Sequence, residues 1–568
     1  MKLLKQIVEQ SLELAIADLG VSDNWKSALG PSREKEQADI TLPCFVIAKE
    51  LKRNPAEIAQ ELAGKIDGNF EVSPVGGYLN FKANPDWLVD VVLNHEIKSN
   101  GKNILIEHTS ANPNGPFHVG RARNAILGDT LVRLHRLYGN DVRAEYYVDD
   151  MGKQVAVLAW ALENLSKQQV EEILSDRDGV NQRWIGKPDH ETVRWYQAAQ
   201  ALRAETNQQI EDAISKLVHD SENGDDSVLK SFEEAYQPVL DGMLETLGRL
   251  GISFDTFTKE SKFVVDGSVS KVMDQLSSLE INGIADNGAN YLDLGQRGLK
   301  GKTEFFYRRG DGSSLYATRD IAYHIWKWSQ SDNLVNVLGE DHKLQAKQVG
   351  LTLTELGYQV PEVLFYAFIK LPEGKMSTRK GNVVFMDDLL EEAKFHAAEV
   401  VRELRDDLSD EKVNQIAEAV GVSAVRFNIT KVSPDKGFTF RWDEALSFEG
   451  GSAPFVMYSH TRACSIAKKI GKEADFTSRD SIPESVYEIS RTMAVFDDKL
   501  EQSVHENKPH IFTLYLLELA TSYNAFYRDC HIISEDGLNE FYFAISEKAR
   551  QLMKSGMEGV GVIPLEEM

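Results

Sequence analysis

His118 and Arg121 are the first residues in this sequence whose types and spacing suggest chemistry. They lie three positions apart at the start of a helical pattern, and a helical turn would bring both onto one face. Both side chains donate hydrogen bonds to phosphate oxygens, and the free N–H groups of a helix start attract phosphate as well. This segment therefore predicts a triphosphate site, although a strand–turn–helix with one histidine and several arginines is also common without a ligand.

Hydrophobic patterns predict the elements that must position this pair. An apolar run over residues 104–106 predicts a buried strand, and turn-forming residues follow it up to Pro116, where a helix start tolerates proline. After the predicted helix and a turn at 139–141, the segment VRAEYYVDD predicts a second strand. A strand–helix–strand unit of this length implies a parallel, Rossmann-like sheet with ligands beyond the carboxyl ends of its strands. The helix is predicted from the apolar residues Val119, Ala122, Ile126, Leu131 and Leu134.

A second segment rich in cations, KMSTRKG, runs from Lys375 to Gly381 and follows a predicted strand at 363–369. NPNGPFHVGR and KMSTRKG resemble, in this order, the H-x-G-H and K-M-S-K-S signatures of class I aminoacyl-tRNA synthetases. The stretches SANPNGPFHVGRARNAILGD and YATRDIAY are similar to those of arginyl-tRNA synthetases in particular. The resemblance extends over nearly the whole chain and is strongest over 104–160 and 302–385.

The resemblance implies an ATP site shared between the two signatures. It assigns ATP binding to His118, Gly120, Arg121, Lys375, Met376 and Ser377, and the catalytic role to His118, Lys375 and Lys380. Arg121 stands in place of the second signature histidine and adds a fixed positive charge suited to phosphate. Gly115 stands where many relatives carry a lysine, and Lys375 on the loop keeps a cation instead. The loop lacks its second lysine, which leaves Arg379 or Lys380 to supply that charge.

The resemblance also implies a pocket for the guanidinium group of arginine, which needs carboxylate or amide acceptors in a site largely closed to water. It assigns this pocket to Glu107, Ser110, Asn112, Tyr316 and Asp320, with Asp150 from the acid pair that ends the second strand. The alternative for the pair of Asp149 and Asp150 is a surface cap of the next helix. Where relatives often carry glutamine near the end of a later strand, this chain has Asp341 or His342, and both possibilities stay open.

Three regions are predicted along the chain. They are an N-terminal α/β domain that contacts tRNA (1–100), a Rossmann-like class I catalytic domain with a helical insertion at about 162–300 (101–385), and an all-α anticodon-binding domain (386–568). In the last region, FEGGSAPFVMYSHTRACS resembles the first anticodon-domain helix of the family. Its Tyr458 and Arg462 are predicted to bind tRNA by stacking and hydrogen bonding with bases. The alternative is that Tyr458 belongs to the hydrophobic core.

Composition limits the possible functions. Hydrophobic residues make up 42% of the 568 positions, and no apolar run is long enough for a membrane span. The three cysteines, Cys44, Cys464 and Cys530, lie too far apart for a disulfide framework or a zinc knuckle, so we expect neither zinc nor another protein-bound metal, and a reducing cytoplasm. A net charge of −25 argues against a nucleic-acid partner unless basic residues gather on one face.

We therefore expect a cytoplasmic, monomeric ligase with no membrane partner. The resemblance implies that it uses ATP, with Mg²⁺ on the phosphates, to activate L-arginine to arginyl-adenylate and to transfer arginine to the terminal adenosine of tRNA-Arg. Relatives of this kind usually need the tRNA for the first step. Two alternatives remain: another class I synthetase, for example one specific for lysine, and a non-catalytic RNA-binding relative, against which the intact signature residues argue.

Overall fold

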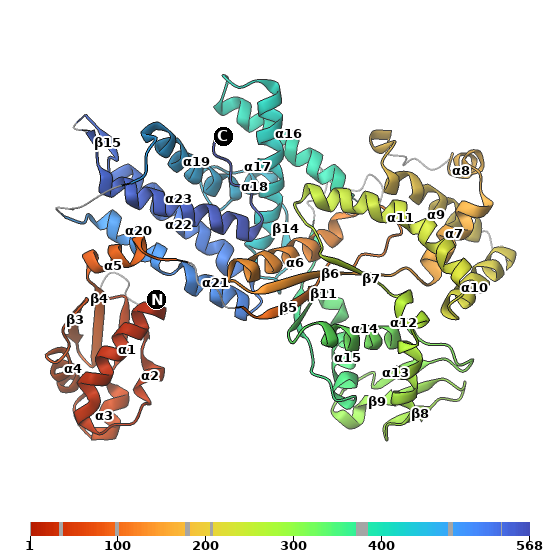
Figure 1. Cartoon of the computed structure of the whole chain (residues 1–568), viewed down its shortest axis with the longest axis horizontal. Helices are drawn as coiled ribbons and strands as arrows, with labels where there is room; N and C mark the ends of the chain where they lie inside the picture. Colours follow the sequence, from red (N-terminus) through yellow and green to blue (C-terminus); the bar gives the residue numbers. More distant parts are fainter. Residues whose placement is uncertain are drawn as a thin grey trace.

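The computed structural model describes residues 2–32, 38–96, 101–175, 182–204, 208–370, 384–474, 481–535 and 537–568. Figure 1 shows a central sheet, an N-terminal unit at the lower left, a group of C-terminal helices at the upper left, and two extensions of the central region at the right. No helix within these described ranges is both long and apolar enough to cross a membrane.

The central sheet is parallel, as the strand–helix–strand pattern predicts. Its spatial order is β12-β11-β5-β6-β7, and every neighbouring pair runs parallel. After β5, the chain places β6 and β7 on one side of it and then β11 and β12 on the other side. This reversal creates a topological switch point between β5 and β11, where α/β sheets bind ligands. The strands are β5 (Asn103–Glu107), β6 (Asp141–Val148), β7 (Thr256–Lys259), β11 (Leu334–Gly339) and β12 (Glu362–Tyr366).

Helices pack on both faces of this sheet. Successive strand residues point to opposite faces, so Ile104 and Ile106 face one side and Glu107 the other. The two isoleucines belong to the same buried core as the apolar side chains of α6, while Lys327 of α14 reaches Glu107 on the opposite face. The helices that precede or follow these strands in the chain are α6 (Val119–Leu137), α7 (Lys153–Asn164), α14 (Tyr316–Gln330) and α15 (Lys343–Glu355).

The stretch predicted as a helical insertion is only partly helical. Its first part forms the helices at the right of Figure 1, but β7 then joins the central sheet beside β6. Beyond it, β8 (Asn282–Ile284), β9 (Asn290–Asp293) and β10 (Glu304–Arg308) form a small antiparallel sheet. Strands of three to five residues are too short to show a reliable period, so these pairings could not be read from the pattern. The helices are α8 (Lys167–Leu174), α9 (Pro188–Ala204), α10 (Gln208–Glu222), α11 (Asp226–Arg249), α12 (Ser261–Val265) and α13 (Ser268–Ser277).

The N-terminal unit has a hydrophobic core largely of its own, built from a four-stranded antiparallel sheet and the helices around it. Two of its helices begin in the same way, with an asparagine cap followed by proline: Asn54 caps α4 and Asn84 caps α5. Its elements are α1 (Lys2–Ile16), α2 (Trp25–Ala28), β1 (Gly30–Pro31), β2 (Ile40–Pro43), α3 (Phe45–Leu51), α4 (Pro55–Ala63), β3 (Phe70–Val75), β4 (Tyr78–Ala83) and α5 (Pro85–Leu93).

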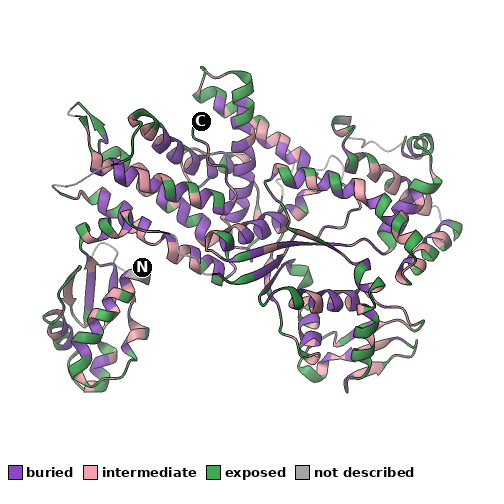
Figure 2. Ribbon diagram, viewed as in Figure 1, coloured by how far each residue is buried: buried purple, intermediate pink, exposed green. Residues whose placement is uncertain are grey.

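The C-terminal region is mainly helical, as predicted, and its core is continuous with that of the central sheet. Figure 2 shows buried residues along the facing sides of α22 and α23. Two very short strand pairs that the sequence did not suggest also occur, β13 (Ile369–Lys370) with β14 (Phe438–Thr439) and β15 (Ile533–Ser534) with β16 (Gly537–Leu538). The helices are α16 (Met386–Leu404), α17 (Asp410–Thr430), α18 (Trp442–Ala445), α19 (Ala453–Ile470), α20 (Glu484–Ala494), α21 (Phe496–His505), α22 (Pro509–Asp529) and α23 (Glu540–Val560).

Candidate active site

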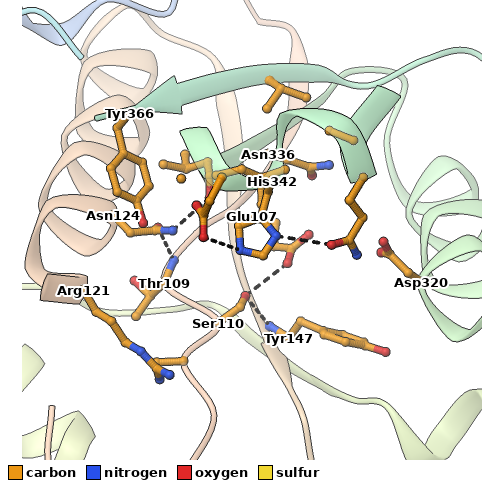
Figure 3. A pocket seen from close by; sticks show the side chains of 18 of the residues that line it. Glu107, Thr109, Ser110, Arg121, Asn124, Tyr147, Asp320, Asn336, His342 and Tyr366 are labelled. Carbon is orange, nitrogen blue, oxygen red and sulfur yellow. Dashed lines mark hydrogen bonds and ion pairs between the residues drawn. The ribbon is translucent and has the colours of Figure 1, made fainter. Parts of the chain in front are cut away.

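A cavity of about 590 Å³ opens at the carboxyl ends of β5, β11 and β12, at the switch point of the sheet. Figure 3 shows Arg121 at the left of this cavity and Asp320 at its right. The cavity is large enough for a small-molecule substrate or cofactor. The predicted site residues that line it are Glu107, Ser110, Asn112, His118, Gly120, Arg121, Tyr316, Asp320, Asp341 and His342.

The turn that leaves β5 is strained. Thr109 and Ser110 adopt positive φ angles of 68° and 37°, which are uncommon for residues other than glycine. The side chain of Asn124 holds this turn in place, since its Oδ1 accepts a hydrogen bond from Thr109 N at 2.7 Å and its Nδ2 donates to Val337 O at 2.9 Å. Asn124, from the second turn of α6, thereby connects the segment after β5 to β11 across the switch point. No motif or spacing in the sequence indicated this role.

The amino terminus of α6 lies at the cavity. His118 is the N-cap and has an extended backbone, so it precedes the first helical turn rather than sharing it with Arg121 as predicted. Both side chains nevertheless line the cavity. Burial, and secondly the charge of Arg121, lowers the pKa of His118 to about 4, so the imidazole is neutral near pH 7. A Cβ at Gly120 would lie 3.0 Å from the His118 ring, so glycine leaves room for this side chain.

The second signature segment, with Lys375, Met376, Ser377 and Lys380, lies at 371–383, outside the described residues. The chain that follows it is described and is attached to the start of α6. Val119 N donates to Val384 O at 3.0 Å, and Met386 N donates to Phe117 O at 2.7 Å. The described chain therefore resumes at Val384 and Met386, directly beside the start of α6 and His118.

Carboxylates occupy the other side of the cavity. Glu107 ends β5, and its Oε1 accepts a hydrogen bond from Ser110 Oγ at 3.1 Å. Asp320 lies one helical turn after Tyr316 on α14, and both side chains line the cavity. Burial favours a neutral carboxyl at Asp320, but contacts with His324, Lys327 and Gln345 outweigh it and hold the pKa of Asp320 below its usual value. An ionised carboxylate at this position suits a cationic ligand.

The two possibilities left open after β11 both reach the cavity. Asp341 and His342 line it from a 3-10 turn, and their side chains are about half exposed, at 59% and 50%. Gln345 on the following helix also lines the cavity and hydrogen-bonds to Asp320. Gln345, three residues beyond His342, is therefore a third candidate for the position at which relatives often carry glutamine.

Asp149 and Asp150, the acid pair directly after β6, lie in two different environments. Asp149 lines the cavity, whereas Asp150, the residue favoured from the sequence, does not. The carboxylate of Asp150 accepts bonds from Ser261 N at 2.9 Å and Ser261 Oγ at 2.6 Å, and burial raises its pKa to about 6. Burial also raises the pKa of both Asp149 and Glu260, which share a hydrogen bond. Asp150 therefore binds Ser261 outside the cavity lining. Neither Asp149 nor Asp150 is exposed, so the alternative of a surface helix cap is wrong.

A further acid and histidine cluster lies outside the cavity. Among the described residues, Asp189, His190 and Asp387 have the composition of a metal site. Lys187 Nζ, however, lies 3.0 Å from both Asp189 Oδ2 and Asp387 Oδ2 and also donates to Thr246 Oγ1 at 2.7 Å. The ammonium group already supplies the positive charge that these buried carboxylates require. This cluster connects α9 and α11 to the start of α16.

The predicted tRNA-binding pair lies on the C-terminal helices. Tyr458 is 43% exposed, so its ring is at the surface and not in the core. The guanidinium of Arg462 lies 4.9 Å from the ring centre of Tyr458 and 4.7 Å from that of Tyr527. Arg462 also donates to Asn524 Oδ1 at 2.8 Å, which fixes its orientation. Together these side chains form a surface group of two aromatic rings around one cation.

The fold and the site define a class of protein. The sequence model described as "tRNA synthetases class I (R), catalytic domain" matches residues 85–442. "Arginyl tRNA synthetase N terminal domain" matches residues 2–83, and "DALR anticodon binding domain" matches residues 456–568. The chain therefore contains a class I synthetase catalytic domain, a class that uses ATP, and the predicted fold class is confirmed.

Individual relatives define the family. An "Arginine--tRNA ligase" of Methanocella arvoryzae is 40% identical over 582 residues, which cover 100% of both chains. One of Methanocaldococcus jannaschii is 38% identical and covers 91% of this chain and 92% of the relative. The solved arginyl-tRNA synthetase of Thermus thermophilus matches with a TM-score of 0.80 at 25% identity over 100% of both chains. The chain belongs to the arginyl-tRNA synthetase family, as the sequence resemblance predicts.

Proposed function

We propose that this chain is an arginine–tRNA ligase and that the cavity at the switch point is its active site. The observation that carries the proposal is the polarity of one cavity: a helix start with Arg121 faces it from one side, and the carboxylates of Glu107 and Asp320 face it from the other. The first side suits the phosphates of ATP, and the second suits a guanidinium group. Membership of the family supports the same reaction.

The proposed reaction has two steps in this cavity. A carboxylate oxygen of L-arginine attacks the α-phosphate of ATP, and pyrophosphate leaves as arginyl-adenylate forms. A ribose hydroxyl of the terminal adenosine of tRNA-Arg then attacks the arginyl carbonyl carbon, and AMP leaves. We propose that ATP enters as its Mg²⁺ complex, in which the metal offsets phosphate charge.

The protein's part in the first step is positioning and charge stabilisation. His118, neutral near pH 7, donates a hydrogen bond to phosphate without adding a charge. The permanent positive charge on this side of the cavity comes from Arg121 instead of His118. Lys375 and Lys380 are assigned to charge that develops on the leaving pyrophosphate, with Met376 and Ser377 in the same segment. The attachment of Val384 and Met386 to the start of α6 supports this assignment, since the described chain resumes there beside His118.

We further propose that tRNA is bound along the N-terminal and C-terminal regions, with domain limits of 1–100, 101–385 and 386–568. The surface group of Tyr458, Arg462 and Tyr527 is suited to stacking with unpaired bases. The net charge of −25 limits the contribution of general electrostatic attraction, so such local groups must provide much of the contact. A monomer in the cytoplasm is the state we expect.

Aminoacylation of total tRNA with each amino acid in turn tests the function. Charging with arginine, and not with lysine, is the expected result. Charging with another amino acid would assign the chain to a different class I specificity. No charging with any amino acid, under conditions where tRNA and ATP bind, would favour a non-catalytic RNA-binding protein.

A further inference from the structure

A row of polar side chains crosses the middle of the central sheet directly below the cavity. In the parallel register, Glu107 of β5 is paired with Asn336 of β11 on one side and with Glu145 of β6 on the other. Residues paired across parallel strands point to the same face. Such a row is unusual in a sheet covered by helices, because buried polar groups require partners. Helix α14 covers this face and supplies them.

Lys327 of α14 is the main partner of this row. Its side chain is 0% exposed, and its Nζ lies 2.6 Å from Glu107 Oε2. Nζ also donates to Asn336 Oδ1 at 2.9 Å and lies 4.3 Å from the centre of the Tyr323 ring. A fully buried ammonium group would be very unfavourable without such contacts. The position of Lys327 is therefore determined by Glu107 and Asn336.

His324 continues these contacts to the second carboxylate of the pocket. Its Nε2 faces two donors, Asn336 Nδ2 at 2.8 Å and Lys327 Nζ at 3.3 Å, so this nitrogen accepts. Its Nδ1 faces two acceptors of Asp320, the carbonyl oxygen at 2.8 Å and Oδ1 at 3.1 Å, so this nitrogen carries the proton. The geometry thus defines a neutral ring with the proton on Nδ1.

These contacts form one continuous relay, Glu107–Lys327–Asn336–His324–Asp320. Asp320, His324 and Lys327 recur at helical spacing, so they lie on one face of α14. With a neutral histidine, the relay contains two carboxylates and one ammonium group and carries a net charge of −1. A guanidinium group carries +1. The relay and its proposed ligand are therefore matched in charge.

We propose that Lys327 is a positioning residue for the arginine pocket, which holds the Glu107 carboxylate in place and cancels one of the two carboxylate charges below the ligand. This inference rests on the proposed function, because it assumes that a guanidinium group binds at Glu107 and Asp320. Lys327 itself does not line the cavity. Its effect is that the relay offers one net negative charge, rather than two, to the single positive charge of the guanidinium group.

Other charged groups lie around the relay without replacing Lys327 in it. Glu145 of β6 accepts a hydrogen bond from Thr256 Oγ1, and Arg143 Nε lies 3.9 Å from Glu145 Oε2. Tyr316 and Asp149 line the cavity above the relay. Arg121, the cation at the phosphate side, contacts Asn112 O at 3.5 Å and not the relay.

The test is a double-mutant cycle with Glu107→Gln and Lys327→Met. Glu107→Gln alone leaves Lys327 buried without its carboxylate and close to the guanidinium, so we expect the KM for arginine to rise at least about 30-fold. Adding Lys327→Met to Glu107→Gln removes that cation and returns the net charge of the relay to −1. We therefore expect the double variant to bind arginine at least about tenfold better than Glu107→Gln, because the repulsive partner has been removed.

The measurements are kcat and KM for arginine and for ATP in tRNA charging, with circular dichroism to monitor folding. Lys343→Met, which removes an exposed lysine at the start of α15, is the matched control and should leave both KM values unchanged. Improvement of the double variant over Glu107→Gln, with the KM for ATP constant, supports the proposal. A double variant that is no better than Glu107→Gln, or that fails to fold, shows that Lys327 acts through packing and overturns it. Absence of arginine charging by the unmodified protein would instead refute the proposed function.

Discussion

Asp320→Asn provides the most direct test of the arginine pocket. The asparagine side chain has the same shape, and its Oδ1 can still accept the bond from His324 Nδ1, which is 3.1 Å long in the structure. The substitution therefore removes a charge and little else. Because the Asp320 side chain is only 19% exposed, water compensates poorly for the lost attraction to a guanidinium group.

The size of the effect follows from this geometry. Removing one partner of a buried, hydrogen-bonded charge pair costs about 2–5 kcal/mol. Since every 1.4 kcal/mol is a factor of ten, kcat/KM for arginine should fall about 30-fold to several thousand-fold. The affinity for ATP should remain nearly the same, because His118 and Arg121 lie on the other side of the cavity.

The assay is tRNA charging at varied arginine concentration, together with ATP binding measured separately. Asp332→Asn, an exposed position just beyond the far end of α14, is the control for loss of a carboxylate in the same region. A decrease of less than threefold in kcat/KM for Asp320→Asn would exclude this carboxylate from guanidinium recognition. An equal loss of ATP affinity would mean that the variant disturbs the whole cavity.

Three further predictions concern other parts of the molecule. Lys187→Met should lower the free energy of unfolding by about 3–5 kcal/mol, because it leaves two buried carboxylates without a cation, and an unchanged urea midpoint would contradict this. Arg462→Ala should weaken tRNA binding and leave the KM for arginine unchanged. Arg528→Ala, which removes an exposed side chain, should change neither the tRNA affinity nor the KM for arginine. Burial raises the pKa of Asp150 to about 6, so its contribution to stability is fully present below its unfolded pKa of 3.8 and is lost as the pH rises through 6. Asp150→Asn should flatten the dependence of Tm on pH between pH 3.8 and 6. The same dependence in the variant and the unmodified protein would show that the pKa of Asp150 is not raised.

Local patterns in the sequence were sufficient for much of the architecture. The strand at 104–106, the helix that follows it and the strand after 141 were predicted from the spacing of apolar residues, which depends only on the period of each element. The signature segments pointed to an ATP site at a helix start. His118 and Arg121 do lie there, although His118 is the cap of the helix and not part of its first turn.

Partnerships between distant segments were decided only by the tertiary structure. A sequence pattern shows which face of an element is apolar, but not which other element will lie against it. Asp149 and Asp150 are adjacent in the chain, yet in the folded protein Asp149 lines the cavity while Asp150 accepts hydrogen bonds from Ser261 at the start of α12. Lys327 looks like an ordinary helix lysine, and its partner Glu107 is 220 positions away. The electrostatics of the pocket therefore arise from the docking of α14 on the sheet, because a buried charge is defined by the groups that surround it in space.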